Sequence, residues 1–109
     1  MPMESLMTGT GPLPMKLSFK SPGDGDMSFY LSGSAWSQTP GSLVIQLLLD
    51  GTVIGEMVGF TNETASHKTL VPVFIAANLT YDTHTVEIQT GNGQTLTDQN
   101  DNFQVLLVS

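Results

Sequence analysis

Residues 43–60, LVIQLLLDGTVIGEMVGF, decide the fold class of this chain. Two apolar runs meet at Asp50-Gly51 without a spacer. Asp-Gly between two such runs is the preferred two-residue turn of a β-hairpin, because both central residues must adopt positive φ. The sequence therefore predicts an antiparallel strand on each side of the turn, over residues 43–49 and 52–60.

Short β-rich stretches separated by turn residues continue on both sides of this hairpin. No window shows apolar residues at sustained helical spacing, so little or no helix is expected. Pro72 lacks a ladder donor and predicts an edge strand or a bulge at its position. The other expected strands cover residues 15–20, 27–34, 66–75, 84–90 and 103–108. Seven or eight strands of this kind predict an all-β fold, a two-sheet antiparallel β-sandwich.

The chain is expected to be one domain with an appended arm. Its 109 residues are enough for a single hydrophobic core. Residues 15–109 are expected to form the β-sandwich domain. Residues 1–14, rich in Gly, Pro, Thr and Met without a period, predict a flexible N-terminal arm. The sequence has no cysteine, so the fold must be stable without disulfides or a thiolate metal site.

The charge balance excludes some classes of partner. Three lysines are the only cationic residues, and the formal net charge is −7. Phosphate recognition needs clustered Lys or Arg, so neither nucleic acid nor an anionic membrane surface is a predicted partner. Only 12% of the residues are charged, a composition that leans towards surface-displayed or virion proteins. Residues 1–6 lack the features of a signal peptide, and no apolar run is long enough to span a bilayer, so the location stays open.

Three segments resemble the bacterial immunoglobulin-like modules of surface and adhesive proteins. They are residues 31–35 (LSGSA), 44–55 (VIQLLLDGTVIG) and 83–88 (THTVEI). In those families the middle segment is a hairpin with a leucine-aspartate-glycine turn, and the last segment enters the penultimate strand from a tight corner. The resemblance covers most of residues 27–108 and implies an immunoglobulin-like β-sandwich. The chain departs from the pattern at Tyr81-Asp82, where a glycine often precedes the last segment.

A jelly roll of the tumour-necrosis-factor or complement-globular-head kind is the alternative fold, since it is similar in length and strand count. Such jelly rolls usually form trimers. Neither family supplies catalytic residues for this chain. An enzyme is not predicted, because no helix is expected that could place a serine on a strand-turn-helix elbow.

Histidines and acidic loops are the remaining candidates for chemistry. His67 and His84 have no carboxylate at a sequence spacing typical of metal ligands. We expect His67 at the surface or paired with Glu63, and His84 hydrogen-bonded to a backbone carbonyl. The acidic loops 24–26 and 98–102 offer oxygen ligands for calcium, but neither matches the EF-hand pattern. Asp and Asn also favour turns in their own right, so no metal and no cofactor is predicted.

Trp36, Tyr30 and Tyr81 are the candidate ligand-binding residues. Aromatic faces stack on the CH groups of a sugar ring, while acidic and amide groups hold its hydroxyls. The simpler interpretation places Trp36 in the core and Tyr81 at a corner. A lectin-like carbohydrate-binding domain is therefore the alternative function.

The hairpin also predicts self-association. With unbroken pairing beyond the turn, both of its faces are apolar, whereas a sandwich in water normally has a polar outer face. A second copy of the chain, in a dimer or trimer, is the expected cover, and the N-terminal arm is the monomeric alternative. The predicted interface residues are Val44, Leu48, Val53 and Met57.

These observations together predict a non-catalytic structural or interaction module. It is expected to self-associate and to be surface-displayed or part of a larger assembly, with a protein or a glycan as its partner.

Overall fold

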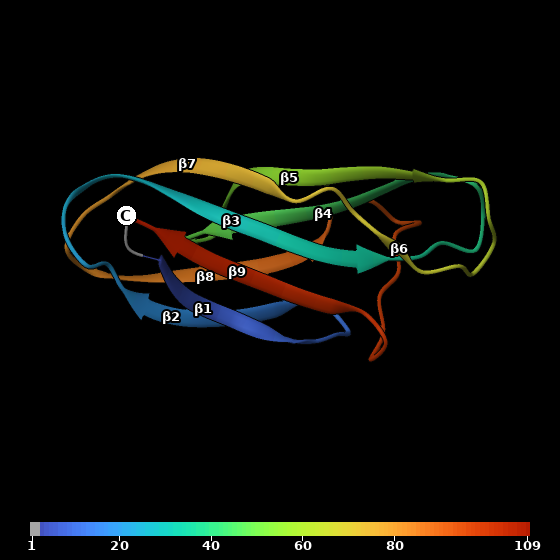
Figure 1. The fold of residues 1–109 in the computed structure, drawn as a ribbon, viewed down its shortest axis with the longest axis horizontal. Helices are drawn as coiled ribbons and strands as arrows, with labels where there is room; N and C mark the ends of the chain where they lie inside the picture. Colours follow the sequence, from blue (N-terminus) through green and yellow to red (C-terminus); the bar gives the residue numbers. More distant parts are fainter. Residues whose placement is uncertain (1–2) are drawn as a thin grey trace.

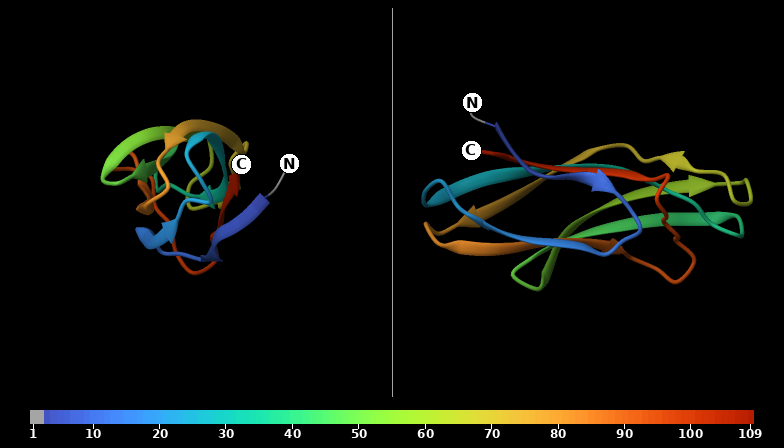
Figure 2. Two further views of the ribbon diagram at one scale, coloured as in Figure 1. Left: turned by 90° about the vertical axis from the view of Figure 1, so that its left-hand side faces the viewer. Right: turned by 90° about the horizontal axis from the view of Figure 1, so that it is seen from below.

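A computed structural model describes residues 3–109, which form two antiparallel sheets packed face to face (Figures 1 and 2). The strands are β1 (Met3–Thr10), β2 (Met15–Lys20), β3 (Gly25–Ala35), β4 (Gly41–Leu49), β5 (Thr52–Thr61), β6 (Lys68–Thr69), β7 (Val73–Leu79), β8 (Thr83–Thr90) and β9 (Asn102–Val108). The predicted all-β sandwich is confirmed, with slightly more strands than expected. No helix able to cross a membrane occurs in this range.

The strands pair in a nested order. β4 pairs with β5 through the hairpin, and outside it β3 pairs with β7, β2 with β8 and β1 with β9. One sheet has the order β1-β9-β3 with β6 and β7 along the far side of β3, and the other has the order β2-β8-β4-β5. A long hairpin rolled up in this way is a jelly roll. The immunoglobulin-like order is not observed, because there the first two strands are neighbours in one sheet, whereas here β1 and β2 lie in different sheets.

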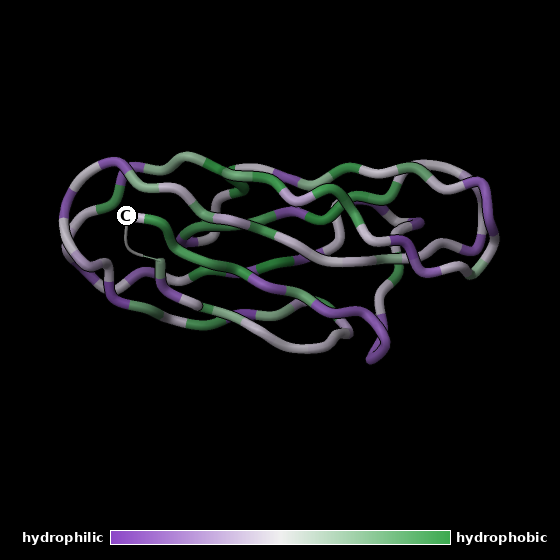
Figure 3. Tube along the Cα trace, viewed as in Figure 1, coloured by the Kyte–Doolittle hydropathy of each residue, from purple (hydrophilic) through white to green (hydrophobic). Residues whose placement is uncertain are grey.

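The core lies between the two sheets, because alternate residues of each strand point inward. β3 shows this regularity over its whole length, with every odd-numbered residue from Met27 to Ala35 buried. Apolar residues follow the inner parts of the strands, and hydrophilic residues are concentrated in the connections (Figure 3). The largest fully buried side chains are Phe29, Phe103, Leu31, Leu43, Ile45, Leu47, Met57, Leu79, Ile88, Leu107, Val86 and Val105.

The turn at Asp50-Gly51 has the predicted conformation. The φ angles are 51° at Asp50 and 86° at Gly51, and Leu49 lies opposite Thr52. Two positive φ angles match the twist of the strands on either side. The sequence signal of this hairpin is confirmed.

The pairing beyond the turn differs from the unbroken register expected. The register shifts between Leu47 and Leu48, because Leu48 lies opposite Val53 while Leu47 lies opposite Gly55. One extra residue in β5 is a β-bulge, and it reverses the direction of the side chains that follow. Met57 therefore points into the core, where it is fully buried, and Val58 points outward.

The N-terminal segment is part of the sandwich rather than a free arm. Residues 3–10 form β1, which pairs with β9 from Met3 opposite Val108 to Thr10 opposite Asn102. Without β1, the edge of β9 would present unpaired backbone groups. Met7 adds a side chain to the core, being only 5% exposed. Met1 and Pro2, the first residues of the expected arm, lie outside the described residues.

The expected strand over residues 66–75 is interrupted at its proline. β6 ends at Thr69 and β7 begins at Val73, and Pro72 lies in the irregular segment between them. The missing N–H donor of Pro72 explains why a continuous ladder does not form there.

Candidate functional site

The outward surface of the β1-β9-β3 sheet carries the first candidate site. Even-numbered residues of β3 point away from the core, and their cross-strand partners on β7 and β9 point the same way. We call this surface the β3 face. Its residues are Asp26, Ser28, Tyr30 and Ser32 of β3, Phe74, Ala76 and Asn78 of β7, and Gln104 and Leu106 of β9.

An aromatic pair lies in the middle of the β3 face. Tyr30 and Phe74 are opposite one another on β3 and β7, with ring centroids 5.2 Å apart and planes inclined by 57°. Phe74 is 64% exposed, although a phenyl ring in water is unfavourable. A large exposed ring packed against a second ring gives this surface an apolar patch that CH-rich groups can cover.

A shallow depression of about 570 Å³ begins one cross-strand pair further along, towards the start of β3, and Tyr30 and Phe74 are not part of its lining. Ser28 and Ala76, opposite one another on the two strands, leave it open because their side chains are short. At its edge, the Nδ2 atom of Asn78 donates a hydrogen bond to the carboxylate of Asp26 at 2.9 Å. The depression therefore offers polar acceptors and donors beside the exposed ring of Phe74.

The structure does not bring the three predicted aromatic residues together. Tyr30 lies on the β3 face, Tyr81 lies in the corner after β7, and Trp36 follows the opposite end of β3. At about 3.3 Å per residue, the two ends of β3 lie roughly 30 Å apart, so Tyr81 and Trp36 are far from one another. Tyr81 is 57% exposed, and the Nζ atom of Lys20 lies 4.4 Å from the centre of its ring. Phe74, which is not among the predicted residues, packs beside Tyr30, whereas Trp36 and Tyr81 do not.

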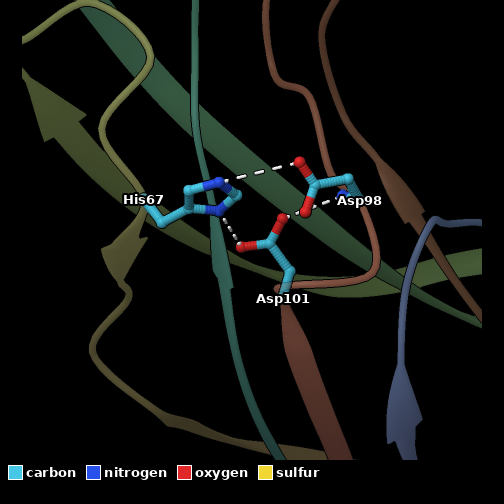
Figure 4. A group of neighbouring side chains, drawn as sticks. All are labelled: His67, Asp98 and Asp101. Atoms are coloured by element: carbon cyan, nitrogen blue, oxygen red, sulfur yellow. Dashed lines mark hydrogen bonds and ion pairs between the residues drawn. The ribbon is translucent and has the colours of Figure 1, made fainter.

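A second cluster, His67, Asp98 and Asp101, lies at the end of the sandwich near Trp36 (Figure 4). The Nδ1 atom of His67 is 2.8 Å from Oδ1 of Asp101, and its Nε2 atom is 3.6 Å from Oδ2 of Asp98. His67 thus lies between two carboxylates from the loop before β9. Of the two expectations for His67, the surface position is confirmed, because the residue is exposed, and the pairing with Glu63 is wrong, because Glu63 pairs with Lys68 instead.

Asp101 is the fixed part of this cluster. Its side chain is fully buried, and it accepts hydrogen bonds from Oγ of Ser34 at 2.7 Å and from the backbone N–H of Asp98 at 2.9 Å. The hydrogen bond to Asp101 raises the pKa of His67 above 6.5, and the nearby negative charges of Asp101 and Asp98 add to the rise. A buried carboxylate with this many donors has little freedom to move.

Trp36 packs beside the cluster. Its ring centroid is 5.8 Å from that of His67, and the backbone of Trp36 forms a bridge with Leu96. The side chain is half-buried, so the predicted core position holds in part. Its Nε1 atom is buried and has no hydrogen-bond partner within residues 3–109.

The cluster does not have the geometry of a nucleophilic triad. A triad needs a nucleophile at one ring nitrogen of the histidine and a carboxylate at the other. His67 has a carboxylate at both nitrogens, and Ser34 bonds to Asp101 rather than to the ring. Imidazole and carboxylate groups are, by contrast, among the usual protein ligands of a metal ion such as Zn²⁺.

His84 occupies a structural position at the hairpin turn. Its Nδ1 atom is 2.7 Å from the carboxylate of Asp50, and its Nε2 atom is 3.0 Å from the backbone oxygen of Thr80. The predicted contact with a backbone carbonyl is present. Hydrogen bonding to Asp50 raises the pKa of His84, and the same bond lowers the pKa of Asp50.

The four predicted interface residues do not share one exposed surface. Met57 is fully buried and Leu48 is 9% exposed, whereas Val44 is half-buried and Val53 is 45% exposed. The bulge in β5 is the reason, since it turns Met57 inward. The other exposed apolar residues of β5 are Val58, at 53%, and Phe60, at 65%.

Comparisons with known proteins concern the fold. No known family matches the sequence, and no curated protein matches it either. A family 35 carbohydrate binding module from Clostridium thermocellum has a similar structure, with a TM-score of 0.53 and 13% identity, over 97% of this chain and 90% of that one.

A second similar structure is dimeric latent PorU from Porphyromonas gingivalis, with a TM-score of 0.59 and 12% identity. The match covers 96% of this chain but only 10% of PorU, so the chain corresponds to a small part of that protein. At these identities both similarities show a shared β-sandwich fold.

Proposed function

We propose that this chain is a non-catalytic binding module that takes neutral saccharides on the β3 face. The observation that carries the proposal is the exposed ring of Phe74, supported by Tyr30, beside a depression bordered by Asp26 and Asn78. The clostridial module named for carbohydrate binding has a similar fold, which supports the suitability of such a sandwich for a saccharide site.

The aromatic pair supplies the apolar part of the recognition. A sugar ring has one face of CH groups, and that face can cover the ring of Phe74 without losing hydrogen bonds to water. Tyr30 packs against Phe74 and restricts its movement, so little side-chain entropy is lost on binding. The phenolic group of Tyr30 adds a donor and an acceptor at the same place.

The depression supplies the polar part. The carboxylate of Asp26 accepts hydrogen bonds, and the amide of Asn78 both donates and accepts them, which suits sugar hydroxyls. Their mutual hydrogen bond holds both groups in position before a ligand arrives. The short side chains of Ser28 and Ala76 leave room for a sugar ring next to the one on Phe74.

The charge of the chain selects neutral over anionic saccharides. None of the three lysines, Lys16, Lys20 and Lys68, is among the residues of the β3 face, and Asp26 adds a negative charge there. An anionic polysaccharide is repelled by this surface and by the net charge of −7.

A glycan array and calorimetry with the hits test the proposal. The array includes neutral oligosaccharides of gluco, xylo, manno and galacto configuration, and oligogalacturonate as an anionic sugar. We expect binding to at least one neutral class and none to oligogalacturonate. Phe74→Ala should weaken binding at least tenfold, because it removes the stacking surface.

Phe60→Ala is the matched control. Phe60 is 65% exposed and Phe74 is 64% exposed, but Phe60 lies on the other sheet. Equal losses of affinity in the two variants would place the binding site elsewhere. Failure of every neutral glycan to bind would overturn the proposal.

Self-association is a second candidate function, favoured by the apolar surface on β4 and β5. Val44 lies opposite Val58, and Phe60 lies two residues further along β5. A small sandwich that exposes Val58 and Phe60 on one surface gains stability when a second copy covers them. Light scattering at tens of micromolar should then show a dimer or trimer that Val58→Lys disrupts, and a monomeric wild type would exclude it.

A further inference from the structure

The cluster of His67, Asp98 and Asp101 has the chemistry of a metal site that the proposed saccharide binding does not use. One ligand atom from each residue lies within 4.8 Å of the others. Asp98 and Asp101 come from the loop before β9, and His67 comes from the segment between β5 and β6. Residues far apart in the sequence are thus brought together by the nested pairing of the strands.

The hydrogen bonds assign different roles to the three residues. Asp101 is engaged by Ser34, by the backbone of Asp98 and by Nδ1 of His67, so it already has a donor at each oxygen. A carboxylate that holds one nitrogen of a histidine fixes the ring so that the other nitrogen can bind a metal. In His67 that other nitrogen is Nε2, which faces Asp98.

The spacing of the facing atoms fits a single bound ion. Nε2 of His67 and Oδ2 of Asp98 are 3.6 Å apart. Two ligand atoms on a tetrahedral zinc ion, each at about 2.0–2.2 Å, lie about 3.4 Å from one another. Only a small movement of Asp98, whose side chain is 39% exposed, is needed to reach that separation.

We propose that Nε2 of His67 and the carboxylate of Asp98 bind a divalent transition-metal ion of the Zn²⁺ class, with Asp101 orienting the imidazole. Solvent completes the coordination, because the side chains of His67 and Asp98 are 34% and 39% exposed. An imidazole ligand favours zinc, nickel or copper over calcium, which prefers six to eight oxygen ligands.

Trp36 makes the proposal directly measurable. It is the only tryptophan of the chain, and its ring lies 5.8 Å from that of His67. We expect Ni²⁺, added to tag-free protein at neutral pH, to quench Trp36 fluorescence in a saturable way with one ion per chain. Zn²⁺ should displace Ni²⁺ and restore the fluorescence, whereas millimolar Ca²⁺ should not.

Variants separate the proposed roles. His67→Gln and Asp98→Asn should each weaken Ni²⁺ binding at least tenfold, and Asp101→Asn should weaken it about 10- to 100-fold as a positioning residue. His84→Gln is the matched control, since His84 pairs with Asp50 at the hairpin turn and should leave Ni²⁺ affinity unchanged. Circular dichroism of each variant establishes that it is folded. Asp98→Asn changes a partly exposed side chain, so the test does not depend on substituting the buried Asp101.

Thermal melting gives an independent readout. Zn²⁺ should raise the melting temperature of the wild type and not that of Asp98→Asn, because an ion that binds only the folded state stabilises it. Unsaturable quenching, or equal affinity in wild type and His67→Gln, would overturn the proposal. The assays contain no saccharide, so their outcome is separate from that of the glycan-binding experiments.

Discussion

Truncation of Met57 compared with truncation of Val58 tests the register of the central hairpin. The bulge places Met57 in the core at 0% exposure and Val58 on the surface at 53%. With the unbroken register these two neighbours exchange sides. Met57→Ala and Val58→Ala are therefore a matched pair whose energetic order depends on the bulge.

The expected magnitudes follow from burial. Met57→Ala removes Cγ, Sδ and Cε from the core. At about 0.8 kcal/mol for each methylene-sized group, the lost burial lowers the free energy of unfolding by about 2.4 kcal/mol. The cavity left behind raises the total to about 3–5 kcal/mol. Val58→Ala removes partly solvated methyl groups from a strand surface and should cost less than about 1 kcal/mol.

Urea denaturation followed by Trp36 fluorescence measures both variants against the wild type. With a slope of about 1–3 kcal/mol per molar urea, Met57→Ala should lower the midpoint by more than about 1 M, and Val58→Ala by only a few tenths. Equal midpoints, or a larger loss for Val58→Ala, would refute the bulged register and restore Met57 to the outer surface.

Two further predictions concern the turn of the same hairpin. Gly51→Val should destabilise the fold by about 1–3 kcal/mol, because a β-branched residue is strained at a φ of 86°, and an unchanged denaturation midpoint would contradict this. The raised pKa of His84 means that its bond to Asp50 stabilises the fold fully below pH 6.5 and loses this effect as the pH rises through the raised pKa. The lowered pKa of Asp50 keeps the bond intact down to pH values below 3.8. The difference in unfolding free energy between wild type and His84→Gln should therefore be larger at pH 5.5 than at pH 9, and a difference independent of pH would count against the pair.

The local features of the fold could be predicted from the sequence, and the long-range ones could not. Asp50-Gly51 specifies its turn through the conformations that these residues allow, and Pro72 removes one backbone donor at its own position. The bulge in β5 has no such local signal, because Val53 and Ile54 are equally apolar and only packing decides which one faces the core. The pairing of β1 with β9 joins the two ends of the described chain, which no short window of sequence can reveal.

The candidate sites depend on the same long-range pairing. Tyr30 was predicted as a ligand residue from its type, but Phe74 lies beside it only because β3 pairs with β7. In the sequence, His67 and the acidic loop at Asp98 and Asp101 are separate features, since Asp101 lies 34 positions after His67. Their meeting follows from the jelly-roll topology, which places both segments at one end of the sandwich.

The most direct test of saccharide binding at the β3 face is an amide chemical-shift titration with a neutral oligosaccharide selected on the array. A saccharide bound at the β3 face should cause saturable shifts concentrated at Asp26, Tyr30, Phe74 and Asn78, with the surface around Val58 and Phe60 unaffected. Shifts confined to the β4 and β5 surface, or absent with every neutral oligosaccharide on the array, would contradict it.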